Sequence, residues 1–422
     1  MNPRPMPLTN RPAWRQCQLW LVPATLVLTF ISSSRSGIAA EPDRKTLADI
    51  PARMQQFVDQ GQISGAVTVV GRHNQVLSHE AVGLRDVESR QAMTKDTLFR
   101  IASMTKPITA AGIMVLADEG KLSIDDAVEK HLREFCGQKL AAGGSGGAAA
   151  LKSPGRKITI RDLLTHTSGL PGGLPPDMAD LYVKRDRTLA EAVAAIAKRP
   201  LEFEPGSRWA YCNAGIDTLG RIIEVVARMP YEKFLQDRIF TPLGMKDTTF
   251  YPNEGQRRRM ATLYDLKQGK LVSAGFQLLG PTDKAKHPIP AGGLYSTGTD
   301  LARFYQTMLC GGQHQCTRIL TEKSVREMTS VQTGQLTAGF VPGMSFGLGW
   351  GVVREPQGVT RVLSAGTFGH GGAFGTQGWI DPKQDLFVIL LIQRVGLPNA
   401  DGSEMRQELQ RLAVRAIGGE NP

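Results

Sequence analysis

The four residues Ser103-Met104-Thr105-Lys106 place a hydroxyl and an amine three positions apart at the start of a predicted helix. A serine there lies near unpaired backbone N–H groups and the positive end of the helix dipole. The lysine lies on the same face, within reach of the hydroxyl. When an apolar pocket buries a lysine, its pKa falls and its amine can accept a proton. The S-x-x-K spacing therefore predicts that Ser103 is a nucleophile for acyl transfer and that Lys106 activates it.

The same residues also fit a plain helix start, with Ser103 as the N-cap and Lys106 exposed to solvent. The neighbouring sequence favours the catalytic interpretation. Arg100-Ile101-Ala102 leads directly into the motif, and an unusually apolar helix follows it, in which a surface lysine would be out of place.

A second group that can move protons lies in Tyr211-Cys212-Asn213, which opens another predicted helix. A tyrosine beside a cationic lysine is expected to have a lowered pKa and to act as general base toward the serine or a deacylating water. Asn213 is expected to bind substrate and to orient Lys106. Tyr251-Pro252-Asn253 has the same spacing, but it reads as a strand end and turn, so the sequence favours Tyr211.

A glycine-rich run, Phe368-Gly369-His370-Gly371-Gly372-Ala373-Phe374-Gly375-Thr376, can bring backbone close to a ligand. An edge strand that starts at Ala373 would offer its N–H, and together with the N–H of Ser103 it would form an oxyanion hole. We expect the His370–Gly372 segment to contact substrate, with His370 binding it or stabilising charge. The alternatives are a plain turn between strands and a structural histidine.

Two rival motifs are rejected. Gly143-Gly144-Ser145-Gly146-Gly147 matches G-x-S-x-G, but that nucleophile elbow needs a strand before it and a helix after it, and the sequence shows neither. His166-Thr167-Ser168-Gly169 invites a serine–histidine interpretation, yet it is typical of a helix end with a glycine cap and indicates a structural role. The seven histidines show no metal-ligand spacing, so no metal site is expected.

The elements that must position these residues follow from hydrophobic periodicity. Helical spacing predicts a first helix over 47–57, a long apolar helix over 97–121 and a closing amphipathic helix over 403–417. Shorter helices are predicted at 160–165, 189–198, 214–227, 231–240 and 299–309. Strands are predicted at 63–70, 76–80, 347–353, 361–364, 375–380 and 386–392.

Strands at both ends of the chain and helices in the middle predict an α+β fold. We expect an antiparallel sheet flanked by the N- and C-terminal helices, with an inserted all-helical region. The sheet part is predicted at about 41–120 and 290–422, the helical part at about 121–289, and the site in the cleft between them. Residues 137–155, rich in Gly, Ala and Ser, are predicted to be a flexible surface insertion.

The first forty residues carry four arginines and no acidic residue; Arg4, Arg11 and Arg15 precede an apolar run over 19–31, and small residues follow up to Ala40. This order is typical of a secretory signal peptide over 1–40, cleaved after Ala39 or Ala40. We therefore expect a periplasmic or secreted protein; the alternative is an uncleaved N-terminal anchor. In an oxidising compartment Cys310 and Cys316 either form a disulfide or stay as thiols, and the sequence leaves both open.

Composition and charge exclude other classes of protein. With 41% hydrophobic and 21% charged residues, the chain is neither disordered nor fibrous. Beyond residue 40 the basic and acidic residues are scattered, without a Lys/Arg block or interleaved aromatic residues. No nucleic-acid partner is therefore expected.

These pieces, in this order, resemble the serine β-lactamase and penicillin-binding-protein superfamily, and in particular its class C-like branch. The resemblance covers nearly all of the mature chain. It implies an α/β sandwich with an all-helical region, acylation of Ser103, and hydrolysis of the acyl-enzyme without metal or cofactor. By position it implies Lys106 as activator, Tyr211 as general acid/base, and the N–H groups of Ser103 and Ala373 as the oxyanion hole. Further segments that carry the resemblance are Leu163–Leu170, Pro242–Met245 with Asp247-Thr248, and Gly292–Ser296.

One departure from the family pattern bears on the substrate. True β-lactamases of this branch carry Lys-Thr-Gly where this chain has His370-Gly371-Gly372. The lysine charge and threonine hydroxyl that help to engage a β-lactam carboxylate are therefore absent. Esterase-like members often show an aromatic residue and two glycines there, and some peptidases show His-Thr-Gly. The resemblance favours a carboxylesterase or transesterase.

We expect a small-molecule ester, amide or β-lactam as substrate. The enzymatic alternatives are a class C-type β-lactamase, a D-Ala-D-Ala carboxypeptidase and a D-aminopeptidase. Outside catalysis, the alternatives are a penicillin-binding sensor that is acylated once and a silent homologue. The presence of Tyr211 argues against the sensor, and the complete Ser-Lys-Tyr set argues against the silent homologue.

Overall fold

The computed structural model describes residues 41–73, 75–142, 150–275 and 279–418. The predicted signal peptide and the G-x-S-x-G match at 143–147 lie outside these residues. In the described part of the chain, no helix has the length and apolar character needed to span a lipid bilayer.

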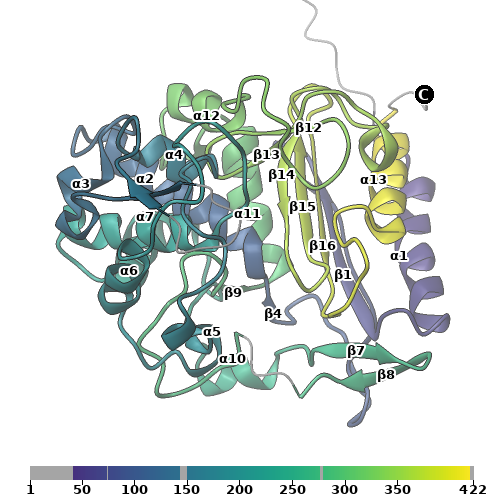
Figure 1. Cartoon of the computed structure of the whole chain (residues 1–422). Helices are drawn as coiled ribbons and strands as arrows, with labels where there is room; N and C mark the ends of the chain where they lie inside the picture. The colour runs from purple at the N-terminus through teal and green to yellow at the C-terminus, as the bar shows by residue number, and fades with distance from the viewer. Residues whose placement is uncertain (1–40, 74, 143–149, 276–278, 419–422) are drawn as a thin grey trace, which may run out of the picture. The chain divides into compact units, whose positions relative to one another are not determined.

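An eight-stranded antiparallel sheet forms the centre of the fold (Figure 1). Its order is β12, β13, β14, β15, β16, β1, β2, β3, so the first strand of the chain pairs with the last. Both β1 and β16 are buried along their whole length, because the two faces of the sheet are covered. The bounds are β1 Gly65–Gly71, β2 Val76–Asp86, β3 Gln91–Ala92, β12 Met344–Phe346, β13 Gly351–Val353, β14 Phe368–Gly371, β15 Gln377–Asp381 and β16 Leu386–Leu391.

Helices cover both faces of this sheet. On one face α1 (Arg44–Asp59) and α13 (Glu404–Ala416) pack against each other and enclose an apolar core with the strands. On the other face α11 (Gly298–Leu309) contacts β16 and β1. The core on that side continues into α2 (Thr105–Asp118) and α7 (Asn213–Ala227), which pack together. The predicted α+β fold with terminal helices on the sheet is confirmed.

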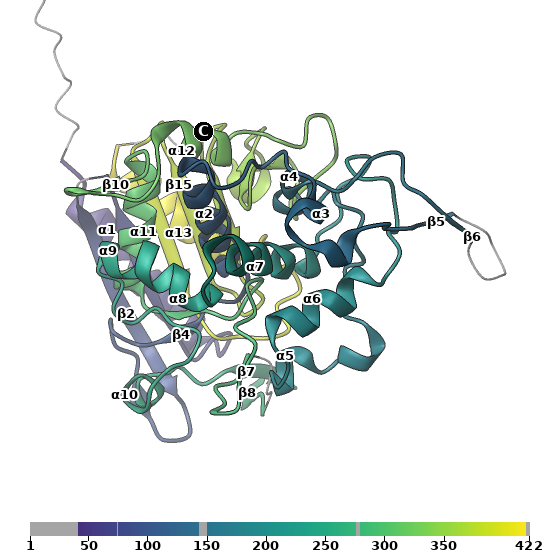
Figure 2. The same cartoon turned by 90° about the vertical axis from the view of Figure 1, so that its left-hand side faces the viewer.

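The inserted region, which the sequence predicts to be all-helical, carries many short helices, but it also contains two hairpins, so the expectation of helices alone is wrong. The described ends of the predicted flexible insertion pair as β5 (Leu140–Ala142) and β6 (Ala150–Lys152), which project from the helices in Figure 2. The second hairpin joins β7 (Tyr264–Lys267) to β8 (Lys270–Ser273). The helices are α3 Val128–His131, α4 Ile160–Leu164, α5 Leu181–Lys184, α6 Leu189–Ala197, α8 Tyr231–Leu235, the π-helical Gln236–Phe240, α9 Thr241–Leu243 and α10 Glu254–Arg258; α12 Glu322–Thr329 follows α11. The division into subdomains at 120 and 290 stays a prediction.

The long helix predicted over 97–121 is shorter than expected. Residues Phe99–Arg100 form β4, which pairs with β9 (Tyr295–Ser296), and α2 begins only at Thr105. Pairing with a distant strand overrides the local apolar pattern here. The prediction of a strand at 361–364 is also wrong. These residues form a turn that follows the 3₁₀ helix Gly358–Thr360.

The two cysteines near the end of α11 are thiols in the structure. Cys310 and Cys316 are both unbonded, and the Cys310 thiol donates to the carbonyl oxygen of His73 at 3.3 Å. Cys316 lies in the turn between β10 (Gln313–His314) and β11 (Thr317–Arg318). Of the two alternatives left open by the sequence, the structure has the reduced one.

Candidate active site

Ser103 lies at the junction between a strand and a helix. After β4 the chain turns through Ala102, whose φ of +46° is in the left-handed region, and α2 begins two residues after Ser103. A non-glycine residue in this conformation costs on the order of 1 kcal/mol and persists where surrounding contacts enforce it. Ala102 and Met104 are buried, whereas Ser103 is partly exposed. The turn therefore leaves the serine as the accessible side chain of this segment.

Lys106 is fully buried, one helical turn after Ser103. Its Nζ donates to Ser103 Oγ at 3.1 Å, to Asn213 Oδ1 at 2.8 Å and to the carbonyl oxygen of Ala291 at 2.6 Å. Burial lowers the pKa of Lys106 to about 7, against the opposing effect of the charge on Asp217. A neutral amine is therefore well populated at neutral pH within hydrogen-bond reach of the Ser103 hydroxyl.

Tyr211 lies just before α7, whose first residue is Asn213. The centroid of its ring is 4.7 Å from Lys106 Nζ, and its side chain is hydrogen-bonded to Ser103. Burial raises the pKa of Tyr211, although the hydrogen bond with Ser103 opposes this shift. The prediction that Lys106 lowers the pKa of Tyr211 is wrong. The loss of solvent around the phenolate outweighs the effect of a lysine that is only partly protonated. Tyr211 therefore keeps its proton at neutral pH.

The competing tyrosine motif does not take part in this arrangement. Tyr251 is 37% exposed and lies under the guanidinium of Arg185. Asn253 caps α10 through a pair of hydrogen bonds with Gln256. The structure brings Tyr211 and Asn213 to Ser103, and it uses the second motif to begin a helix.

The glycine-rich run forms the whole of β14 and the turn after it, which packs against the residues before Ser103. A Cβ atom on Gly372 would lie 2.5 Å from the carbonyl oxygen of Ile101, an approach that only glycine permits. Thr376 Oγ1 donates to the same oxygen at 3.1 Å. The prediction that a strand starts at Ala373 is wrong. Ala373 lies in the turn, because β15 begins only at Gln377. Among the hydrogen bonds of the described residues, none uses the N–H of Ala373.

His370 is a buried residue of β14, so the alternative of a plain turn at this position is wrong. Burial lowers the pKa of His370 to about 3, and Lys106 acts in the same direction. The neutral ring donates from Nδ1 to the carbonyl oxygen of Gly371 at 2.6 Å. This tautomer leaves Nε2 as an acceptor, which has no hydrogen-bond partner in the described part of the chain. His370 therefore cannot supply the positive charge of the missing lysine.

His166 shapes the approach to Tyr211. His166 follows the end of α4, as the sequence predicts. The chain turns there through two residues with positive φ, His166 at +60° and Gly169 at +80°. The Nδ1 of His166 accepts from the N–H of Cys212 at 3.2 Å, and its carbonyl oxygen accepts from the N–H of Ala210 at 2.9 Å. These two bonds fix the backbone on both sides of Tyr211. The ring centroid of Tyr211 lies 4.6 Å from that of His166.

Sequence reasoning missed Asp217. This residue lies on α7 four positions after Asn213 and is fully buried. Its Oδ1 accepts from the N–H of Ala291 at 2.9 Å, and its Oδ2 accepts from the hydroxyl of Tyr182 at 2.6 Å. The available signal was the i, i+4 spacing of two polar residues on a helix face that is otherwise apolar.

An aromatic wall, which the sequence also did not reveal, stands beside Tyr211. It consists of Trp209, Phe340 and Phe346; the ring centroid of Trp209 lies 5.7 Å from that of Phe340 and 5.6 Å from that of Phe346. Phe340 lies 4.9 Å from the Tyr211 ring and is 44% exposed, although its side chain is large and apolar. The wall gives this side of the site an apolar surface.

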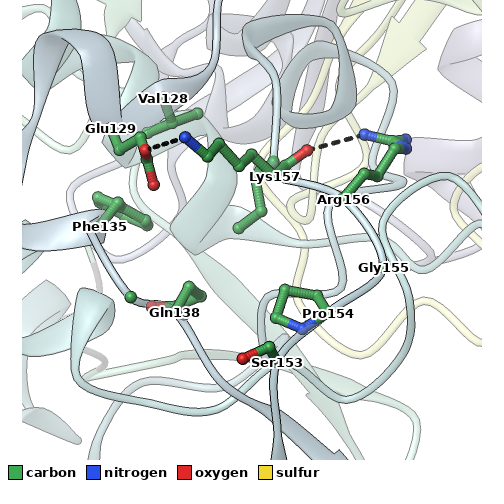
Figure 3. A pocket seen from close by; sticks show the side chains of 11 residues that line it. Val128, Glu129, Phe135, Gln138, Ser153, Pro154, Gly155, Arg156 and Lys157 are labelled. Carbon is green, nitrogen blue, oxygen red and sulfur yellow. Dashed lines mark hydrogen bonds and ion pairs between the residues drawn. The ribbon is translucent and has the colours of Figure 1, made fainter.

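The cavity shown in Figure 3 lies elsewhere, between the ends of hairpin β5–β6 and α3. It measures about 320 Å³ and shares no residue with the site described above. Its charged groups are already paired: Lys157 with Glu129 at 2.6 Å, and Arg156 with Asp162. In the described part of the chain, no cluster of His, Cys, Asp or Glu has the arrangement of a metal site.

Comparison with known proteins gives relatives along most of the chain. The model of the family described as Beta-lactamase matches residues 50–412. Protein Rv1367c of Mycobacterium tuberculosis is 36% identical over 366 residues, which cover 81% of this chain and 88% of that protein. Esterase EstB of Burkholderia gladioli is 30% identical over 371 residues, covering 82% of this chain and 90% of the esterase. The solved structure of EstCE1, described as a hydrolase with promiscuous acyltransferase activity, superposes with a TM-score of 0.71 at 26% identity, covering 89% of this chain and 99% of EstCE1.

Proposed function

The chain belongs to the Beta-lactamase family and is a serine hydrolase of that superfamily, and from this premise we propose that it is an exported carboxylesterase acting through an acyl-enzyme on Ser103. One observation carries the proposal: the fully buried amine of Lys106, with a pKa of about 7, donates a 3.1 Å hydrogen bond to the hydroxyl of Ser103. In its neutral form this amine accepts a proton from the serine.

The acylation step follows from these contacts. As Ser103 Oγ bonds to the carbonyl carbon of the ester, its proton passes to the neutral Nζ of Lys106. The electron pair of the carbonyl moves to its oxygen, which accepts hydrogen bonds from the N–H groups of Ser103 and Ala373. When the intermediate collapses, the bond to the alcohol oxygen breaks. The alcohol leaves with a proton from Tyr211, which is protonated at neutral pH and regains its proton from the Lys106 ammonium.

Deacylation reverses these transfers. Water attacks the acyl carbon while it gives its proton to Lys106, which is neutral again. The bond between the acyl carbon and Ser103 Oγ breaks, the serine takes back a proton, and the carboxylic acid leaves. Asn213 orients the lysine throughout, since its Oδ1 accepts from Nζ at 2.8 Å. Every proton is exchanged among Ser103, Lys106, Tyr211, substrate and water, so the step needs no further reactant.

The substrate class is inferred from the neutral surroundings of Ser103. His370 stands where β-lactamases of this branch have a lysine, and its lowered pKa keeps it uncharged. A substrate carboxylate therefore finds no cation at this position, whereas an uncharged ester needs none. Relatives named Esterase EstB and Lovastatin esterase, at 30% and 28% identity, support the same choice.

Export is proposed from the sequence of residues 1–40. Three arginines, with no acidic residue, precede an apolar run and a series of mostly small residues that ends at Ala40. This order supports a signal peptide that directs the protein to the periplasm or out of the cell. Expression of the full chain, followed by N-terminal sequencing of the exported protein, tests this: a mature terminus at residue 40 or 41 is expected, and retention of Met1 would contradict it.

The esterase proposal is tested by turnover of a short-chain p-nitrophenyl ester. Because Ser103 supplies the nucleophile, Ser103→Ala is expected to lower kcat by roughly 10³-fold or more. Equal rates for wild type and variant would refute the proposal. Faster hydrolysis of a chromogenic cephalosporin than of the ester would reverse the ranking in favour of a β-lactamase. A stable acyl-enzyme seen by mass spectrometry without turnover would instead indicate a penicillin-binding sensor.

A further inference from the structure

A buried carboxylate, that of Asp217, is linked to Lys106 through Ala291. No direct bond joins Asp217 to Lys106 among the hydrogen bonds and ion pairs of the described residues; each is hydrogen-bonded to the backbone of Ala291. The N–H of Ala291 donates to Asp217 Oδ1 at 2.9 Å, and the carbonyl oxygen of Ala291 accepts from Lys106 Nζ at 2.6 Å. The backbone of one residue thus connects the carboxylate to the lysine.

We propose that Asp217 is a positioning residue of the esterase site, which holds Ala291 in place for Lys106 and stabilises the protonated form of that lysine by its negative charge. This inference rests on the proposed function, since it assigns Lys106 the transfer of the serine proton. Asp217 itself touches neither Ser103 nor the place where a substrate would bind.

The hydrogen bonds of Asp217 are those of an ionised carboxylate. Both oxygens accept: Oδ1 from a backbone N–H and Oδ2 from the hydroxyl of Tyr182 at 2.6 Å. A buried ionised group must be compensated by such bonds or by an opposite charge. His287 is also fully buried, with Nε2 3.9 Å from Oδ2, and its ring stacks on Tyr182. The carboxylate is therefore enclosed by groups that fix its position.

Asp217 is the main source of negative charge that favours the protonated form of Lys106. The groups whose negative charge favours the ammonium form of Lys106 are Asp217 and Cys212. Burial raises the pKa of Cys212 to about 11, so this group is a neutral thiol at pH 7. The other titratable groups that face the pair from neighbouring elements are Tyr182 on α5, Tyr231 on α8, Tyr211 before α7, His166 after α4, His370 on β14 and His287.

The expected consequence appears in the acidic limb of the pH–rate profile. Only the neutral amine of Lys106 accepts the serine proton, so activity falls as the pH drops through the pKa of Lys106. Asp217→Asn keeps the shape and the bond from Ala291 but removes the charge that favours the ammonium. The pKa of Lys106 then falls, and the limb moves to lower pH, by on the order of one unit.

The experiment compares wild type with Asp217→Asn between pH 5 and 9. It measures kcat/KM for a short-chain p-nitrophenyl ester and, separately, the rate at which a fluorophosphonate labels Ser103. Asp300→Asn is the matched control, since Asp300 is also buried but its carboxylate accepts hydrogen bonds from Asp247, Thr248 and Arg303, none of which belongs to the site. An unmoved limb in Asp217→Asn, or an equal movement in Asp300→Asn, overturns the proposal.

A second variant keeps the test valid if Asp217→Asn does not fold. Tyr182→Phe retains the carboxylate but removes a donor that partly neutralises it. The influence of the charge on Lys106 then grows, and the limb is expected to move to higher pH; an unchanged limb would overturn the proposal. Failure of the esterase function is distinguishable, because ester turnover would equal that of Ser103→Ala while the labelling of wild-type Ser103 still reports Lys106.

Discussion

The fully buried Lys106 and the partly buried Tyr211 both favour their neutral forms. Burial lowers the pKa of the lysine and raises that of the tyrosine, so an amine and a phenol face Ser103 near pH 7. The amine is suited to accept the first proton and the phenol to give the next one, which assigns the roles of base and acid. His370 adds a third neutral group. With Lys106 in its neutral form, the three groups nearest Ser103 are uncharged, which suits an uncharged ester.

The pH dependence of the wild type should show this directly. The pKa of Lys106 is lowered to about 7, and the proton must be absent for catalysis. We expect kcat/KM to rise tenfold per pH unit below pH 7 and to level off above it. Lys106→Arg keeps the charge but cannot lose its proton, so ester turnover should fall by roughly 10²–10⁴-fold at every pH. A variant that regains activity at high pH would contradict this role for Lys106.

At this scale the sequence predicts the participants better than their states. The Ser103–Lys106 spacing and the Tyr211–Asn213 pair identify residues that the structure brings together. The direction of the pKa shift of Tyr211 depends on how deeply the ring is buried, and no local pattern contains that information. Asp217 was missed for the same reason, because its partners Ala291 and Tyr182 approach it only in the folded chain.

The turn after β14 fixes the position of the nucleophile. Gly372 lies against the carbonyl oxygen of Ile101, and Thr376 is hydrogen-bonded to that oxygen, while Ala102 is held at a positive φ. The residues before Ser103 are thus held between β9 on one side and this turn on the other. Rigid contacts on both sides keep the hydroxyl and the N–H of Ser103 in a constant orientation.

Gly372→Ala tests this contact. The added methyl group would lie 2.5 Å from the carbonyl oxygen of Ile101, so the turn or the serine segment must move. We expect kcat/KM to fall by roughly tenfold to a hundredfold, since a displacement of about 1 Å has that effect at an active site. Gly173→Ala is the control, because nothing lies within 4 Å of a Cβ atom there. Equal activity of the two variants would show that the contact does not position Ser103.

Elements of regular periodicity were predicted well, and those made by distant pairing were not. The first and last helices and the strands β1 and β16 follow their amphipathic or apolar patterns. In contrast, β4 reads as part of a helix until its pairing with β9 is known, and β14 reads as a glycine-rich turn. Both of these strands lie at the site, where close approach of backbones matters more than side-chain periodicity.

Across the whole molecule, stability of the sheet depends on two helices from opposite ends of the chain. α1 and α13 pack on the same face of the sheet and share one apolar core. Arg406 of α13 is buried there, with its guanidinium 3.8 Å from the centroid of the Trp379 ring. The face of β14 and β15 that lies behind the site is therefore held by the C-terminal helix.

Leu409→Asp should unfold the protein for this reason. Leu409 is 2% exposed in the core between α13 and the sheet. A carboxylate there lacks partners and costs several kcal/mol, a large share of the roughly 5–15 kcal/mol that stabilises a typical domain. Circular dichroism should show lost cooperative melting, whereas Arg415→Ser on the exposed face of the same helix should melt as the wild type does. A native melting curve for Leu409→Asp would contradict this description of the core.

The pairing of β1 with β16 also determines the order in which the molecule can assemble. Val69 lies opposite Ile389, so the strand made first has to wait for the strand made last. A contact between such distant residues closes a very long loop, which makes it slow and late in folding. A ribosome therefore releases nearly the whole chain before the middle of the sheet can close. If the chain is exported as proposed, such a delay keeps the polypeptide unfolded during translocation, and Ser103 gains its left-handed neighbour and its buried amine only afterwards.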